Sequence, residues 1–222
     1  MLSLNDISDL NSAVEKAAEF IIDGGVIGVP TDTIYGLAAS AQNAHAIRHL
    51  YEIKGRDENK PIAICVDCVH SIALWGEVDA LPLGLLESLL PGPVTIVVKR
   101  TALLNPLLNP EITSVGIRIP DHEFIRSLCK KVGMPLALTS ANLSNGPSAL
   151  CPEEFKNIWP YLSAVFHNGP IGDSAALRAG STIVDLTTPG RYSILRSGSA
   201  LAATSALLKK FGLEEKSQNG VF

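Results

Sequence analysis

The stretch Val26-Ile27-Gly28-Val29-Pro30-Thr31-Asp32-Thr33-Ile34-Tyr35-Gly36 decides the fold class. Its first four residues are apolar and mostly β-branched, which is typical of a short buried strand, and Pro30 ends the run. Hydroxyls and a carboxylate follow at once. A buried strand that ends in polar side chains predicts a sheet with a binding site at its edge.

Helical and strand patterns alternate outward from this stretch. Before it, Ser12 and Glu15 form a capping-box pattern, and apolar residues spaced by three and four predict a helix that Gly24 and Gly25 end. After it, a helix is predicted from Asn43. Strands are predicted at 62–66, 94–98, 115–119, 136–138, 164–166, 182–186 and 192–195, and helices near 82–90, 122–131, 152–158 and 200–211. This alternation predicts an α/β fold, a mixed sheet with helices packed against it.

Composition predicts one autonomous domain over residues 1–222. Of the 222 residues, 46% are hydrophobic and 18% charged, enough to bury a sizeable core and far from the composition of disordered chains. We expect the core to span about 12–212 and a polar tail to follow over 213–222. No apolar run approaches the ~18 residues of a membrane helix, so no membrane span is expected.

Charge and cysteine content limit the partners and the compartment. The net charge of -4 argues against a surface that holds nucleic acid throughout, but it is compatible with a local basic site. The first arginine is Arg48 and acidic residues precede it, unlike a targeting segment. Four cysteines in no dense framework indicate reduced thiols. We therefore expect a cytoplasmic protein and leave a mitochondrial form open.

Three cations lie close together at Lys54, Arg56 and Lys60, while the common phosphate loop, the dinucleotide fingerprint and the zinc-protease motif are all missing. Arginine forks and lysine ammonium groups can neutralise a polyphosphate without such a loop. The alternative is a solvated loop whose charges are balanced by neighbouring acids. If Lys54 is a loop cation aimed at a ligand, Lys54→Ala should abolish turnover and leave thermal stability nearly unchanged.

Other polar clusters follow predicted strands. Residues 139–148 are rich in hydroxyls and amides, which suit a phosphate, a ribose or an ordinary turn. Arg118 lies within an apolar run, and a buried guanidinium needs a partner, either a ligand carboxylate or an internal Asp or Glu. Ser181 precedes a strand and Arg196 ends one. These clusters could converge on one pocket.

Six stretches match, in order and spacing, the signature of the threonylcarbamoyl-AMP synthase family, also called the YrdC-like family. They are 29–37, 54–56 with 60–61, 90–95, 116–120, 139–144 and 181–185. The chain resembles the short form that lacks the extra C-terminal domain. The resemblance implies a YrdC-like twisted mixed sheet with a concave basic active-site cleft.

It also implies the reaction. The family condenses L-threonine, bicarbonate or CO2 and ATP, with Mg2+, into threonylcarbamoyl-AMP and pyrophosphate. A partner transferase then modifies tRNA, and weak tRNA contact is a further expectation. By position the implied catalytic residues are Lys54, Arg56, Ser140 and Asn142. The implied ATP-binding residues are Arg56, Lys60, Ser114, Ser140, Ser148 and Arg196, and the implied L-threonine-binding residues are Thr33, Cys65, Arg118 and Ser181. No protein metal site is expected.

Two positions depart from the family pattern, and two other functions stay open. Asp57 stands where many members have Pro, and Cys65 stands where many have His, so the role of Cys65 is uncertain. Cys65 and Cys68 have zinc-like spacing but no second pair, which favours structural thiols. The alternative functions are a non-catalytic RNA-binding module and a carbamoyl-transfer domain like that of HypF.

Overall fold

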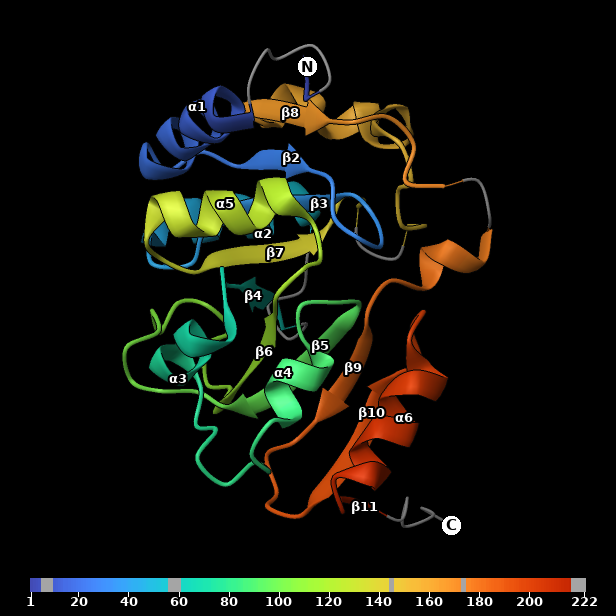
Figure 1. Cartoon of the computed structure of the whole chain (residues 1–222). Coiled ribbons are helices and arrows are strands. Elements are labelled where there is room, and N and C mark those ends of the chain that lie inside the picture. Colours follow the sequence, from blue (N-terminus) through green and yellow to red (C-terminus); the bar gives the residue numbers. More distant parts are fainter. Residues whose placement is uncertain (5–9, 56–60, 144–145, 173–174, 217–222) are drawn as a thin grey trace.

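The computed structural model describes residues 1–4, 10–55, 61–143, 146–172 and 175–216. Its strands are β1 (Leu2–Ser3), β2 (Ile27–Val29), β3 (Gly36–Ser40), β4 (Ala63–Cys65), β5 (Val94–Lys99), β6 (Ser114–Arg118), β7 (Leu136–Ser140), β8 (Ala164–His167), β9 (Thr182–Asp185), β10 (Arg191–Arg196) and β11 (Glu214–Glu215). They form one sheet in the order β1-β8-β2-β3-β7-β4-β6-β5-β9-β10-β11 (Figure 1). Neighbours pair in both directions, for example β2 antiparallel to β3 and parallel to β8. The predicted mixed α/β fold is confirmed.

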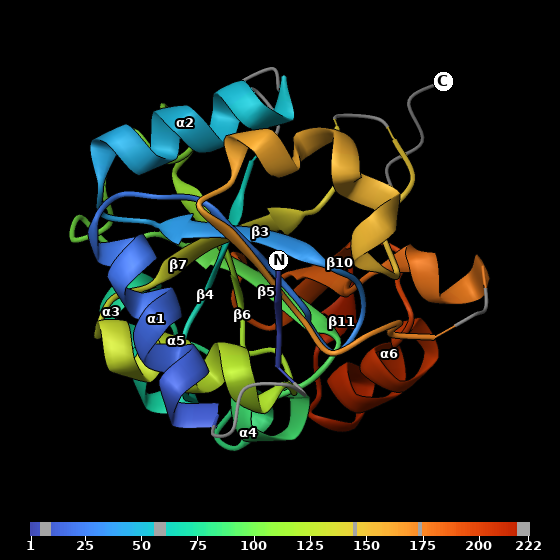
Figure 2. The same ribbon diagram turned by 90° about the horizontal axis from the view of Figure 1, so that it is seen from above.

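Helices cover both faces of this sheet. They are α1 (Leu10–Ile22), α2 (Ala44–Lys54), α3 (Ile72–Trp75), α4 (Leu85–Leu89), α5 (Glu123–Val132) and α6 (Leu201–Lys210), with 3-10 helices η1 (Val69–Ser71), η2 (Pro152–Tyr161) and η3 (Ala175–Ala179). Seen from above, α1 and α5 lie side by side on one face, and α2 lies on the opposite face with the orange helix η2 (Figure 2). The sheet is therefore buried between two helical layers where these helices lie.

Apolar spacing explains how the helices dock. In α1, Val14, Ala17, Ala18 and Ile21 recur every three or four residues, and all four are buried. They pack with α5 and one sheet face into a cluster that includes Leu128. A second, larger cluster covers the opposite face and extends under α3, α4 and α6. The two cores hold the sheet rigid, which fixes the strand ends that carry polar residues.

The end of α2 is defined by its caps. Asn43 Oδ1 accepts hydrogen bonds from the backbone N–H groups of His45 and Ala46 at 2.9 and 3.1 Å, so the helix begins where the sequence predicts. Gly55 ends it in the left-handed conformation, with φ of 52°. Lys54 is thus the last residue of a well-formed helix and not a loop residue.

Several sequence-based boundaries are wrong. The helix α1 begins at Leu10, so Ser12 lies inside it and the predicted capping box is not its start. The strand β3 was not predicted, and the segment expected as an α-helix at 152–158 is the 3-10 helix η2. Leu213 is buried and β11 pairs with β10, so the predicted tail is packed at least to Glu215.

Candidate functional site

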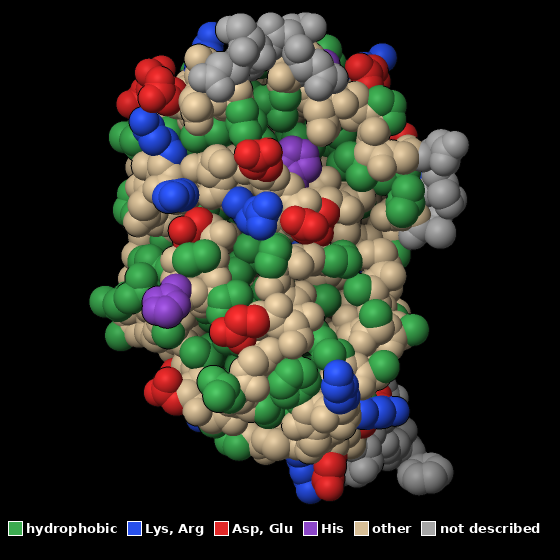
Figure 3. Space-filling view, viewed as in Figure 1, with side chains coloured by type: hydrophobic (Ala, Val, Ile, Leu, Met, Phe, Trp, Pro, Cys, Tyr) green, Lys and Arg blue, Asp and Glu red, His purple; other side chains and the backbone are tan. Residues whose placement is uncertain are grey.

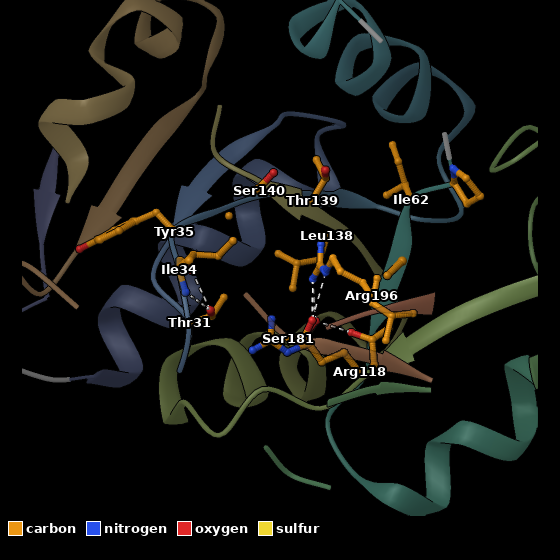
Figure 4. Close-up of a pocket in the computed structure, with 15 residues that line it drawn as sticks. Thr31, Ile34, Tyr35, Ile62, Arg118, Leu138, Thr139, Ser140, Ser181 and Arg196 are labelled. Carbon is orange, nitrogen blue, oxygen red and sulfur yellow. Dashed lines mark hydrogen bonds between the residues drawn. The ribbon is translucent and has the colours of Figure 1, made fainter. Parts of the chain in front are cut away.

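A pocket of about 190 Å³ opens where the polar ends of the central strands meet. Its walls come from the segment between β2 and β3, from the residues just before β4 and β9, and from β3, β4, β5, β6, β7, β9 and β10. Figure 4 shows Ser140 and Thr139 on one side and Arg118, Ser181 and Arg196 on the other. The lining residues are Thr31, Ile34, Tyr35, Gly36, Pro61, Ile62, Ala63, Thr95, Arg118, Leu138, Thr139, Ser140, Ser181, Ile183 and Arg196.

Arg118 is buried at the end of β6 and meets the segment that decided the fold class. Its Nη2 donates to Asp32 Oδ1 at 2.5 Å and to Thr33 Oγ1 at 2.8 Å. Burial lowers the pKa of Arg118, and the Asp32 carboxylate opposes that shift. The structure therefore shows the internal carboxylate that the sequence left as one of two alternatives.

A turn built by Thr31 delivers Asp32 and Thr33 to that guanidinium. Thr31 Oγ1 accepts hydrogen bonds from the backbone N–H groups of Thr33 and Ile34 at 3.1 and 3.2 Å and donates to the Ile34 carbonyl at 2.7 Å. One hydroxyl thus satisfies three backbone groups and sharpens the turn after β2. The turn is what brings Thr33 Oγ1 within reach of Arg118.

Arg196 supplies a second guanidinium on the same pocket. Its Nε and Nη2 donate to the Ser181 carbonyl at 3.1 and 2.9 Å, and Nη2 also donates to Ser181 Oγ at 3.1 Å. The Ser181 hydroxyl pairs with Thr95 Oγ1 at 2.8 Å. Although the residue as a whole is exposed, desolvation of its guanidinium lowers the pKa of Arg196, and repulsion from Arg118 lowers it further. Two neighbouring guanidinium groups favour an anionic ligand.

Close packing of backbone holds Arg196 beside Ser181. A Cβ at Gly198 would lie 2.3 Å from the carbonyl carbon of Ser181 and from the nitrogen of Thr182. Only glycine allows the chain leaving β10 to pass so near the start of β9. The predicted clusters around Ser181 and Arg196 therefore form one unit.

Lys54 joins the end of α2 to the end of β7. Its Nζ donates to the carbonyls of Ser140, at 2.7 Å, and Asn142, and approaches Asn142 Oδ1 at 3.3 Å. The side chain is buried, with 3% exposure. Lys54 thus fixes the Ser140–Asn142 segment beside the pocket, and the expectation of a loop cation aimed only at ligand is wrong.

The structure brings most of the predicted site together. The pocket is lined by Ser140, Arg118, Ser181 and Arg196. Thr33 is outside the lining and accepts a hydrogen bond from Arg118. Lys54 and Asn142 flank Ser140. Ser148 lies outside the lining, and its carbonyl accepts a hydrogen bond from Arg178 at 2.6 Å. Arg56 and Lys60 lie outside the described residues, so their ATP-binding roles stay predictions.

Two predicted residues lie elsewhere. Cys65 is fully buried, and its Sγ lies 3.6 Å from Cys129 Sγ of α5, on the sheet face opposite the large core. It is not among the residues that line the pocket, and its L-threonine-binding role stays a prediction. Ser114 stands at the far end of β6 from Arg118, paired with Lys99. It lies four positions along the strand from the pocket residue Arg118, roughly 13 Å at ~3.3 Å per residue.

Sequence reasoning assigned no individual role to Asp32, Thr95 and His122, which lie in or beside the site. Asp32 and Thr95 belong to stretches that matched the family signature, but a side chain's partner across 86 positions is not visible in a pattern. His122 precedes α5 and lies near enough to Asp32 for the carboxylate to raise its pKa, although burial lowers that pKa more. An Asp directly after a buried strand was the available signal for Asp32.

Metal ligands, membrane-spanning helices and surface charge are the features that concern possible partners of the chain. Within the described ranges, no group of three or more His, Cys, Asp or Glu side chains could hold a metal ion. None of the described helices combines the length and apolarity needed to cross a bilayer. On the face seen in Figure 3, Lys and Arg side chains are interspersed with Asp and Glu. A basic cleft depends on Arg56 and Lys60 and stays a prediction.

Sequence comparisons with known proteins point to one family. The Sua5/YciO/YrdC family model, described as "Telomere recombination", matches residues 19–198. A Bos taurus threonylcarbamoyl-AMP synthase is 50% identical over 203 residues, 90% of this chain and 73% of the relative. The Homo sapiens protein of that name is 49% identical over 204 residues, with the same coverage of both chains.

A solved structure shows the same fold. The P. abyssi Sua5 structure complexed with L-threonine superposes with a TM-score of 0.81 at 24% identity, over 97% of this chain and 61% of that one. The chain thus spans about three fifths of that protein. From the family model, which covers most of the sequence, and the half-identical relatives, we conclude that the chain belongs to the Sua5/YciO/YrdC family.

Proposed function

We propose that this chain is a threonylcarbamoyl-AMP synthase, an enzyme that joins L-threonine, bicarbonate and ATP into threonylcarbamoyl-AMP, with release of pyrophosphate and water. The observation that carries the proposal is the convergence of Arg118, Ser181, Arg196 and Ser140 on one pocket, in a chain half identical to proteins of that name.

The charge in the pocket suits an anionic reactant. Arg118 and Arg196 contribute two positive charges and Asp32 one negative charge, which leaves a net charge of +1. In the part of the chain that the structure describes, no carboxylate forms an ion pair with Arg196. A threonine carboxylate would neutralise this excess, and the Ser181 hydroxyl on the pocket wall would pair with its side-chain hydroxyl.

The size of the pocket separates the two substrates. Its volume of about 190 Å³ is below the roughly 300–1,000 Å³ of common ligand sites, so it can enclose an amino acid but not ATP as well. The nucleotide would extend past Ser140 and Asn142, and Arg56 and Lys60 remain its predicted phosphate ligands. Such an arrangement puts the α-phosphorus beside the carbamate of the bound threonine.

Positioning and charge neutralisation are the chemistry that these residues can supply. A carbamate oxygen attacks the α-phosphorus, the new P–O bond forms as the bond to pyrophosphate breaks, and no covalent enzyme intermediate is needed. The pocket accordingly offers hydroxyls, amides and cations in fixed positions. Serine differs from threonine by one methyl group, worth about 1–3 kcal/mol, so discrimination against serine should be modest.

Magnesium would enter with the nucleotide. No Asp or Glu is among the residues found to line the pocket, so its described walls offer no carboxylate ligand for Mg2+. Mg2+ commonly binds mainly through substrate phosphates and water, and when bound to ATP it would neutralise phosphate charge. The protein's part is then to hold the phosphates with Lys and Arg.

The wider role follows from the product. An activated carbamate with an AMP leaving group requires an acceptor nucleophile, and we propose a transferase that passes it to tRNA, with weak tRNA contact by this chain. The compartment we propose is the cytoplasm, with a mitochondrial form left open.

A pyrophosphate-release assay tests the function. The chain is incubated with ATP, Mg2+ and bicarbonate, with and without L-threonine, and release should require threonine. Ser181→Ala should raise KM for threonine, whereas Lys131→Ala, which removes a surface pair with Glu15, should leave the kinetics unchanged. Release without threonine, or none at all, would refute the proposal.

The same preparation separates the alternatives. Consumption of carbamoyl phosphate in place of threonine and bicarbonate would indicate a HypF-like carbamoyl transfer. Strongly salt-dependent tRNA binding without any nucleotide binding would indicate an RNA-binding module.

A further inference from the structure

The hydroxyl groups of Thr95 and Ser181 meet on the wall of the pocket. Thr95 lies on β5, and Ser181 comes directly before β9, the strand that pairs with β5. The two hydroxyl oxygens are 2.8 Å apart, and both residues are buried and line the pocket. A buried hydroxyl is costly unless it is hydrogen-bonded, so the partners of this pair decide what it can offer a ligand.

Arg196 restricts the direction of the hydrogen bonds at this pair. Its Nη2 donates to Ser181 Oγ at 3.1 Å (Figure 4), and a guanidinium cannot accept a proton in return. Of the two hydroxyl protons, one is used between Thr95 and Ser181, whichever of the two oxygens donates. Among the described residues neither hydroxyl has a further acceptor. The second proton is therefore left for a ligand in the pocket.

Packing against the neighbouring strand β6 fixes the orientation of the Thr95 side chain. A Cβ at Gly116 would lie 3.2 Å from Thr95 Cγ2, so the methyl group of Thr95 lies over the bare backbone of Gly116. A β-branched side chain has few allowed χ1 rotamers, and with the methyl group held there the hydroxyl is held toward Ser181. The hydroxyl pair is therefore in place before any ligand binds.

We propose that Thr95 is a specificity-determining residue for the amino acid: together with Ser181 it offers one donor proton, which the side-chain hydroxyl oxygen of threonine accepts. The inference rests on the proposed function, in which the threonine carboxylate neutralises the excess positive charge of Arg118 and Arg196. The hydroxyl is then the polar group of the side chain that remains to be recognised. A site that donates to a substrate hydroxyl rejects an analogue without it far more strongly than an apolar pocket rejects a missing methyl group.

Two analogues of threonine separate the hydroxyl from the methyl group. L-Serine keeps the hydroxyl and lacks the methyl group, whereas L-2-aminobutyrate keeps the methyl group and lacks the hydroxyl. The wild type should therefore discriminate more strongly against 2-aminobutyrate than against serine, measured as ratios of kcat/KM in the pyrophosphate-release assay. A wild type that uses 2-aminobutyrate as well as it uses threonine would overturn the inference.

Thr95→Val removes the hydroxyl and keeps the branched shape of the side chain. It should lower the preference for threonine over 2-aminobutyrate about 3- to 10-fold, the scale of one hydrogen bond. Its preference for threonine over serine should stay at the wild-type value, because both amino acids carry the hydroxyl. A general disturbance of the pocket would instead weaken the use of all three amino acids. Thr95→Ser keeps the hydroxyl and should retain the wild-type preference over 2-aminobutyrate.

Thr182→Val is the matched control. Thr182 follows Ser181 in the chain, lies outside the pocket lining, and has a buried hydroxyl without a hydrogen-bond partner among the described residues. The same substitution there should leave both preferences at the wild-type values. Combining Thr95→Val with Ser181→Ala should lower the preference over 2-aminobutyrate by less than about 2-fold beyond Ser181→Ala alone, because the two hydroxyls deliver one proton. Losses that multiply would show two independent hydrogen bonds and overturn the inference.

Failure of this inference can be told apart from failure of the proposed function. Threonine-dependent pyrophosphate release by the wild type, with an unchanged preference over 2-aminobutyrate in Thr95→Val, would overturn only the role of Thr95. Release by the wild type without threonine, or no release, would overturn both. If Thr95→Val does not fold, Thr95→Ala decides by the same ratio of preferences, since it also lacks the hydroxyl.

Discussion

Asp32 neutralises Arg118 from inside the protein, at 2.5 Å between Oδ1 and Nη2, with only 11% and 8% of the two side chains exposed. A guanidinium buried to this degree needs a counter-charge whether or not ligand is bound. Asp32 Oδ2 and Arg118 Nε have no hydrogen-bond partner among the described residues. The pair therefore orients Arg118 and leaves Arg196 to supply the excess positive charge of the pocket.

Asp32→Asn should destabilise the fold and weaken threonine binding. Removing one charge of a buried pair costs on the order of 3 kcal/mol, because the remaining charge stays desolvated. We expect that loss in the free energy of unfolding, measured by urea denaturation, together with a raised KM for threonine.

Asp185→Asn is the comparison, since Asp185 pairs with Lys216 at 3.1 Å in a more exposed position, with 18% and 30% exposure. Its loss of stability should be smaller, and its KM for threonine should stay at the wild-type value. Equal losses of unfolding free energy in the two variants would show that burial of the Asp32–Arg118 pair does not increase the cost of removing one of its charges.

Lys54→Met should reduce both turnover and stability. Methionine keeps an unbranched stem and removes the ammonium that binds the carbonyls of Ser140 and Asn142. The Ser140 carbonyl would keep the Asn142 N–H as a donor at 2.9 Å, so the cost is the loss of the ammonium's hydrogen bonds, and a hydrogen bond to a charged group contributes roughly 1.5–3 kcal/mol. We therefore expect a lower midpoint of thermal unfolding along with strongly reduced pyrophosphate release. A variant that loses turnover at unchanged stability would show that Lys54 acts on the ligand and not by holding the Ser140–Asn142 segment.

Gly198→Ala should disturb the threonine site. The added Cβ would meet backbone atoms of Ser181 and Thr182 at 2.3 Å, so the end of β10 or the start of β9 must shift. Because Ser181 and Arg196 depend on that contact, we expect KM for threonine to rise by at least about 10-fold. The exposed neighbour substitution Ser197→Ala should have no such effect. Wild-type kinetics in Gly198→Ala would contradict the close packing.

These predictions show which parts of the molecule a sequence can reveal. Apolar spacing located α1, α5 and most strands, because burial follows periodicity. The strand β3 was missed since Gly36, Ala38 and Ala39 carry small side chains without a strand pattern, and only its pairing with β2 and β7 makes it a strand. Tertiary contacts decide such segments.

The features of the site also fall into those that the sequence predicted and those that it could not predict. Residue types at strand ends predicted Arg118, Ser181 and Arg196, because a polar or charged side chain next to an apolar strand can be recognised from the local sequence. The burial of Lys54, the orientation of Cys65 toward Cys129 and the pairing of Asn109 with Ile62 depend on residues 47 to 88 positions away. No local pattern encodes these distances, so the sequence could not show that the Cys65 thiol lies against Cys129.

Thiol accessibility should divide the four cysteines into two classes. Cys68 is exposed and Cys151 partly so, whereas Cys65 and Cys129 are buried against each other. The hydrogen bond to Cys65 and burial raise the pKa of Cys129 well above the usual value, so its reactive thiolate is scarce. A disulfide reagent should titrate about two thiols in the native protein and all four in denaturant. Cys68→Ser should remove the fastest phase, and rapid reaction of more than two native thiols would contradict the packing.

The last prediction concerns acid stability at the Glu154–Arg178 pair. Arg178 donates to both carboxylate oxygens of Glu154, at 2.6 and 2.8 Å, and Glu154 also accepts the Leu150 N–H at 2.9 Å. Hydrogen bonding to Arg178 lowers the pKa of Glu154 to about 2. A carboxyl whose pKa is depressed on folding stabilises the protein above its unfolded pKa of about 4.5, and the stabilisation disappears as pH falls toward 2. The thermal midpoint of Glu154→Gln should therefore lie below that of the wild type at pH 7, and the gap should close between pH 5 and 2. Glu15→Gln, at an exposed pair with Lys131, should show little difference at either pH. A gap for Glu154→Gln that stays constant with pH would mean that Leu150 and Arg178 hold the neutral side chain equally well.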